Sequence, residues 1–103
     1  MRLAFRMRLL PGNEEEYKRR HDKIWPEMVE MLHNYGASNY SIYLDYKTDD
    51  LFGYVEIADI DKWNESSKNE INQKWQDHMC DIMETESNNF AKCEVLTEVF
   101  HLN

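Results

Sequence analysis

The sequence predicts one α+β domain, in which helices cover one face of an antiparallel β-sheet. Some segments alternate apolar and polar residues, which is typical of strands; in others apolar residues recur every three to four positions, which is typical of helices. The segments follow one another in the order β-α-β-β-α-β. A length of 103 residues suits a single domain, so we expect residues 1–103 to form it.

The first strand and the first helical region are separated by turn residues. Leu3 to Leu10 alternates as a strand does, and Pro11-Gly12 ends it. Asn13 can cap the helix that follows, and Gly36 can end it. Pro26 lies inside the helical pattern and removes a backbone donor, so we expect a kink or a break there.

Three further strands are predicted, two of them in a hairpin. Ala37 to Tyr46 and Leu51 to Ile57 flank a polar turn, with Tyr40 on the same face of the first strand as Ile42 and Leu44. Cys93 to Leu102 alternates again, which predicts a final strand.

The second helical region is predicted to be split. Asp59 or Asp61 can cap a short helix that contains Trp63. Ser67-Lys68-Asn69-Glu70 has the S-x-x-E pattern of a capping box, and the apolar stripe after it includes Trp75. This element order is that of the ferredoxin-like split β-α-β fold, with its helices on one face of the sheet. A second copy of the same sheet is the cover we expect for the other face.

Charge and cysteine content narrow the possible partners. The net charge of −8 disfavours nucleic acid and anionic membranes, and no apolar run approaches the roughly 20 residues that span a bilayer. Arginines interrupt the apolar residues of the N-terminal segment, which lacks a signal-peptide core. Cys80 and Cys93 form no CxxC motif. We therefore expect a cytoplasmic protein with free thiols and a small or neutral partner.

His21 is the leading candidate for proton transfer, because its ordinary pKa of about 6.5 suits chemistry near neutrality. Tyr17 lies four residues earlier on the same helical face, and both should point toward the sheet, where Tyr40 can approach. From the spacing alone, a buried histidine that bonds a carbonyl is an equally good interpretation. Arg19 and Arg20 follow acidic residues, so we expect solvated ion pairs on the helix surface.

Other chemistry-bearing motifs are missing from the sequence. Trp75 can be a core residue or a platform for the apolar face of a sugar. His78 and Cys80 fall on different helical faces, and His33 and His101 have no ligand-like neighbours, so no metal site is predicted. There is no P-loop, dinucleotide fingerprint or nucleophile elbow. The pattern favours simple proton transfer without a cofactor.

Two long runs resemble the L-rhamnose mutarotase family. Glu15 to Glu27 reads EEYKRRHDKIWPE, and Gly36 to Asp45 reads GASNYSIYLD; similarity continues in register along almost the whole chain. The resemblance implies a homodimeric, ferredoxin-like protein of the dimeric α+β barrel type that interconverts the anomers of a 6-deoxyhexose. It implies no cofactor or metal, and a monosaccharide as the partner.

The resemblance also implies roles for individual residues. It makes His21 the proton donor and places Tyr17, Tyr40 and Trp75 at positions that bind the sugar. The family has a second tryptophan directly after the first, but here the residue is Gln76, which brings a polar amide to the substrate-binding position. L-Fucose is therefore an alternative substrate to L-rhamnose. A small dimeric monooxygenase and a non-catalytic sugar-binding module are the other functions that this fold allows.

Overall fold

The computed structural model describes residues 1–103 and confirms the predicted order of strands and helices. β1 (Arg2–Arg8) is followed by α1 (Glu14–Asp22) and α2 (Pro26–Asn34). The hairpin consists of β2 (Ala37–Asp45) and β3 (Asp50–Ile57). The remaining elements, in order along the chain, are α3 (Ile60–Glu65), the 3₁₀ turn η1 (Ser66–Lys68), α4 (Glu70–Met79), the 3₁₀ turn η2 (Cys80–Ile82) and β4 (Glu94–Val95).

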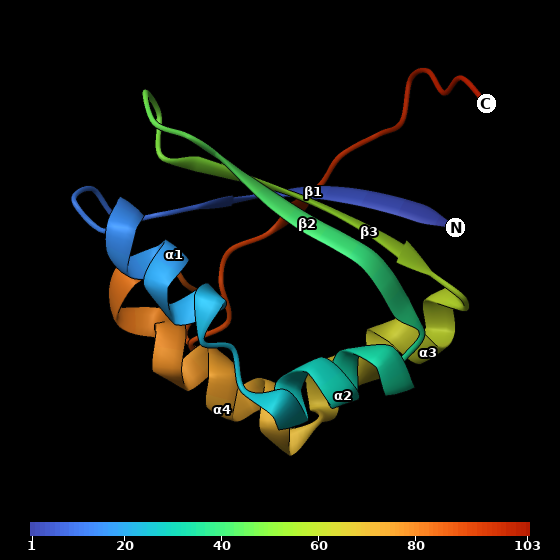
Figure 1. The fold of residues 1–103 in the computed structure, drawn as a ribbon, viewed down its shortest axis with the longest axis horizontal. Helices are drawn as coiled ribbons and strands as arrows, with labels where there is room; N and C mark the ends of the chain where they lie inside the picture. The colour runs from blue at the N-terminus through green and yellow to red at the C-terminus, as the bar shows by residue number, and fades with distance from the viewer.

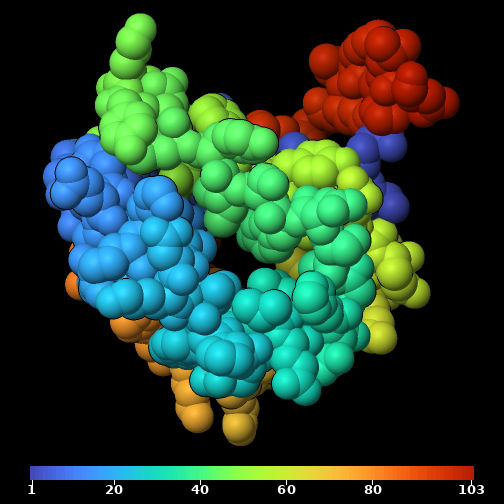
Figure 2. Space-filling model, viewed as in Figure 1, coloured from blue at the N-terminus to red at the C-terminus, as the bar shows by residue number.

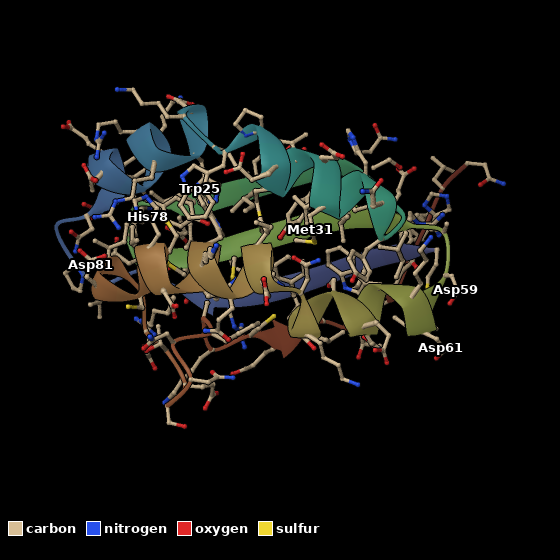
Figure 3. All side chains as sticks on the ribbon, turned by 90° about the horizontal axis from the view of Figure 1, so that it is seen from below. Trp25, Met31, Asp59, Asp61, His78 and Asp81 are labelled. Atoms are coloured by element: carbon tan, nitrogen blue, oxygen red, sulfur yellow. The ribbon has the colours of Figure 1, made fainter.

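The four strands form one antiparallel sheet in the order β2-β3-β1-β4, and the helices lie together on one side of it (Figure 1). Seen from the helical side, α1 and α2 follow one another in one row, and α3 and α4 form a second row beside it (Figure 3). The opposite face of the sheet carries no helix, as predicted. The helices are too short or too polar to cross a membrane.

Alternation along β3 sets which residues face the helices. Leu51, Gly53, Val55 and Ile57 are buried, whereas the residues that alternate with them are partly exposed. Two clusters fill the space under the sheet: one surrounds Leu9, Leu51 and Trp75, and the other contains Phe5 and Val55. Phe5 lies opposite Gly53 in the strand register, so its ring rests over a residue without a side chain.

The predicted break at Pro26 is confirmed, because Trp25 takes an extended conformation and Pro26 begins a new helix. Gly36, with φ 91°, ends α2 in the left-handed conformation that glycine accepts readily. Asp59, one of the two residues proposed for the short helix, caps α3 by accepting from the Asp61 and Lys62 amides.

Three local predictions were wrong. Asn13 does not cap α1, because its amide instead donates to the Leu10 and Pro11 carbonyls. The capping box at Ser67–Glu70 does not form; Asn69 caps α4 by accepting from the amides of Ile71 and Asn72. The last strand is limited to Glu94–Val95, since the chain beyond it leaves the sheet and projects away from the fold (Figure 1).

Candidate active site

A cavity of about 690 Å³ lies between the sheet and the helices. In the space-filling view the molecule is hollowed between β2 and the helices α1 and α2 (Figure 2). The cavity has a mostly apolar lining and a few polar groups, which is typical of small-molecule sites. The five residues predicted for the site all line it: Tyr17, His21, Tyr40, Trp75 and Gln76.

α1 supplies a stacked pair of rings. Three glutamates in its first turn and basic residues in its last turn suit the helix dipole. Because Tyr17 and His21 are one turn apart, both face the sheet, and their rings stack with centroids 4.2 Å apart at an angle of 28°. Tyr17 is buried, and the loss of hydration, together with the nearby Tyr40, raises its pKa. Its hydroxyl is therefore neutral and able to donate.

His21 is held on two sides. Its Nδ1 lies 3.1 Å from the carbonyl oxygen of Tyr17, and its ring meets Trp75 edge to face at a centroid distance of 5.4 Å. Burial lowers the pKa of His21, and this effect outweighs the opposing influences of the Tyr17 carbonyl and the Asp22 carboxylate. The imidazole is thus oriented by the protein and can exchange a proton near neutral pH.

Tyr40 lines the cavity from β2, at a point where the strand is irregular. The register shifts between Ser38 and Ser41, and Asn39 adopts a φ of 47°. The ring of Tyr40 packs near Phe5 and Trp63, at centroid distances of 6.0 Å and 6.4 Å. Although 36% of the residue is exposed, burial of its hydroxyl raises the pKa. Tyr40 therefore offers a second neutral hydroxyl to the cavity.

α4 supplies an indole and an amide. Trp75 is only 5% exposed and belongs to the core as well as to the cavity wall, so both interpretations of this residue hold. Trp25 meets it edge to face at 5.1 Å, and Figure 3 shows Trp25 and His78 lying toward each other between the two rows of helices. The Gln76 amide donates to Asn72 Oδ1 at 3.3 Å, and its Oε1 accepts from the Ala91 amide at 3.2 Å.

The prediction for Arg19 and Arg20 holds only in part. Arg19 pairs with Glu16 on the exposed surface, as expected. The side chain of Arg20 is only 13% exposed, because it bonds Asp81 and the His78 carbonyl at the far end of α4, in addition to Glu16. This bridge ties the helix that carries His21 to the helix that carries Trp75.

Two contacts around the site could not be recognised in the sequence. Arg20 and Asp81 are 61 residues apart, so no helical spacing connects them. Asn72 is buried, donates to the Ser66 carbonyl and orients Gln76, although an asparagine inside a polar helix turn is unremarkable as sequence. Together, the five predicted residues bring an imidazole, two neutral phenols, an indole and an oriented amide to one cavity. Such a set can bind a small polyhydroxylated molecule and transfer protons on it.

Comparison with known proteins gives a consistent result. The family model for L-rhamnose mutarotase matches residues 2–102. The chain is 48% identical to an L-rhamnose mutarotase of Lachnoclostridium phytofermentans over 103 residues, covering 100% of this chain and 99% of the relative. It is 52% identical to an L-rhamnose mutarotase of Listeria monocytogenes over 101 residues, covering 98% and 97%.

Solved structures agree with the fold. The crystal structure of an L-rhamnose mutarotase from Formosa agariphila superposes with a TM-score of 0.92 at 39% identity, covering 100% of this chain and 99% of that one. A Nitrosomonas europaea protein assigned to antibiotic biosynthesis monooxygenases superposes with a TM-score of 0.64 at 10% identity, covering 96% and 89%. The second likeness shows a shared ferredoxin-like architecture alone.

Proposed function

The chain belongs to the L-rhamnose mutarotase family, and we propose that it is an isomerase that interconverts the α and β anomers of L-rhamnose. The observation that carries the proposal is that His21, Tyr17 and Tyr40 line one cavity. The activity for which the relatives are named supports L-rhamnose over L-fucose as the substrate.

Mutarotation needs only proton transfer. A proton leaves the anomeric hydroxyl, the ring oxygen gains one, and the ring opens to the free aldehyde. Rotation about the C1–C2 bond and reclosure then give the other anomer. We assign to His21 the delivery of the proton to the ring oxygen, a role that typically contributes about 10²–10⁴-fold to the rate.

The neutral phenols and the α4 side chains are assigned to binding. Tyr17 and Tyr40 line the cavity and have raised pKa values, so their hydroxyls can hydrogen-bond sugar hydroxyls without ionising. Trp75 is so deeply packed that a sugar would meet a strip of the indole instead of its whole face. Gln76, whose amide is already oriented by Asn72, can bond a sugar hydroxyl at the same wall.

Saturation transfer between the anomeric protons tests the activity. Saturating one anomer of L-rhamnose should reduce the signal of the other faster with protein than with buffer, and L-fucose serves as the competing substrate. His21→Ala should bring the exchange to the buffer rate, whereas His33→Ala, which alters another histidine in the cavity wall, should retain it. Exchange of neither sugar above the buffer rate would refute the proposal, and binding without exchange would indicate a sugar-binding module.

A homodimer formed through the uncovered face of the sheet is also part of the proposal. Tyr43, 68% exposed, pairs with Phe52 on that face. The chain beyond β4 carries exposed apolar side chains at Val99, Phe100 and Leu102, and it projects from the same molecule as an arm (Figure 1). A second copy would cover both features.

Light scattering after gel filtration tests the dimer. Wild-type protein should have twice the mass of one chain, and Tyr43→Glu should shift it toward the monomer, while Tyr46→Glu in the turn beyond β2 should not. A monomeric wild type would contradict the dimer. We place the enzyme in the cytoplasm, a proposal supported by the two free thiols of Cys80 and Cys93.

A further inference from the structure

We infer that His21 enters the reaction as the base, and that the proton it gives to the ring oxygen is the one it has just removed from the anomeric hydroxyl. The inference rests on the proposed function and identifies the source of the proton that His21 delivers. It makes one imidazole sufficient for both transfers.

The orientation of the imidazole carries the argument. Nδ1 lies 3.1 Å from the Tyr17 carbonyl oxygen. A carbonyl oxygen can only accept, so Nδ1 must carry the hydrogen and donate it. In the neutral ring the other nitrogen, Nε2, is then an unprotonated acceptor. Because Nδ1 is turned toward the helix backbone while His21 lines the cavity, Nε2 is the nitrogen available to a substrate.

The surroundings keep this resting ring neutral. Burial lowers the pKa of His21 from its ordinary 6.5, although the Tyr17 carbonyl and the Asp22 carboxylate oppose the shift. The other titratable groups that line the site are Tyr17, Glu14 and Lys18 on α1, His33 on α2, Tyr40 on β2 and Tyr46 just beyond it, and the imidazole of His78 packs against Trp75 on α4. No fixed negative charge of the cavity wall touches Nε2, so nothing there holds a proton on it at neutral pH.

No other residue of the cavity is a better base. Tyr17 and Tyr40 have raised pKa values, so their phenolate forms are scarce at neutral pH. Glu14 also lines the cavity, but its pKa is lowered by hydrogen bonds at the start of α1, which makes its carboxylate a weak base. Asp22 also lines the cavity, but its carboxylate is largely exposed and paired with Lys18, and His33 is exposed in the last turn of α2. Nε2 of His21 is therefore the best-placed acceptor beside the two phenols.

Both proton transfers use the same nitrogen, Nε2 of His21. Nε2 takes the proton of the anomeric hydroxyl as the C1–O bond of that oxygen becomes a carbonyl and the bond from C1 to the ring oxygen breaks. The imidazolium then gives the same proton to the released ring oxygen, which becomes a hydroxyl. Both oxygens were bonded to C1, so a small shift brings Nε2 from one to the other. Reclosure after rotation about C1–C2 reverses both transfers and leaves His21 neutral.

The pH dependence of kcat/KM for L-rhamnose tests the order of the transfers, once the exchange rate in buffer is subtracted. If His21 starts as the base, kcat/KM should be level at neutral pH and fall about tenfold per pH unit below the pKa of His21, which lies under 6.5. If His21 starts as the acid, kcat/KM should instead fall as the pH rises through that pKa, and the inference would be overturned.

Two controls test whether the fall in kcat/KM at low pH, the acid limb of the profile, belongs to His21. His33→Gln and His78→Gln remove the other imidazoles near the cavity and should leave the limb in place. Nitrogen-15 spectra of the free enzyme should show His21 with a protonated Nδ1 and a bare Nε2, titrating with the pKa of the limb. A protonated Nε2 in the neutral ring would overturn the inference. Absence of exchange above buffer at every pH would instead refute the proposed function.

Discussion

Gly53→Ala tests whether the packing under the sheet positions the site. A Cβ built on Gly53 would lie 2.3 Å from the tip of the Phe5 ring, whereas ordinary contact begins near 3.4 Å. The ring must therefore retreat by roughly 1 Å, in a core where added atoms typically cost about 1–3 kcal/mol. Phe5 is buried and meets Tyr40 edge to face at 6.0 Å, so its displacement should also disturb Tyr40.

Chemical denaturation and anomer exchange measure these two effects. Gly53→Ala should lower the free energy of unfolding by about 1–3 kcal/mol and the melting temperature by roughly 4–8 °C for each kcal/mol, and should raise KM more than it lowers kcat. Phe5→Leu makes room for the new methyl group. The double variant should therefore lose less free energy of unfolding than the two single variants lose together. An unchanged stability of Gly53→Ala, or strict additivity with Phe5→Leu, would refute this reasoning.

Three further predictions concern the helices and are checked by chemical denaturation. Asn69→Ala should destabilise the chain by about 0.5–2 kcal/mol because it removes the cap of α4, whereas Ser67→Ala should have little effect; equal losses would contradict the cap assignment. Arg20→Met should cost about 1–3 kcal/mol and raise KM, because the bridge to α4 is lost, and a loss no greater than that of exposed Arg19→Met would contradict the bridge. Arginine partners lower the pKa of Glu16 from 4.5 to about 2, so its stabilising effect is present above pH 4.5 and lost as the pH falls toward 2; Glu16→Gln should weaken this acid dependence, and an unchanged dependence would count against the ion pairs.

Periodicity predicted the elements well because it reports which face of each segment is buried. The break at Pro26 followed from a local property, the missing backbone donor. Helix caps were harder to predict. The capping residue is the one with an extended backbone just before the helix, and at α4 that residue is Asn69. The length of the final strand was overestimated. Alternation between Cys93 and Leu102 does not show how many of these residues pair with β1, and only Glu94 and Val95 do.

The candidate site was also predictable from the sequence only in part. The spacing of Tyr17 and His21 placed them on one helical face, and the hairpin pattern placed Tyr40 on the inner face of β2. The contacts of Gln76 with Ala91 and of Arg20 with Asp81 could not be predicted, because they join segments that are distant in the sequence. The orientation of the His21 ring is also a property of the folded chain, and it decides which nitrogen meets the cavity.

The most direct test of the central claim is the rate of exchange between the two anomers of L-rhamnose, measured by saturation transfer with wild-type protein and with His21→Ala. Wild-type protein should accelerate the exchange, and His21→Ala should return it to the buffer rate while retaining the unfolding transition of a folded chain. Undiminished exchange in folded His21→Ala protein would contradict the claim that His21 transfers the proton in this cavity.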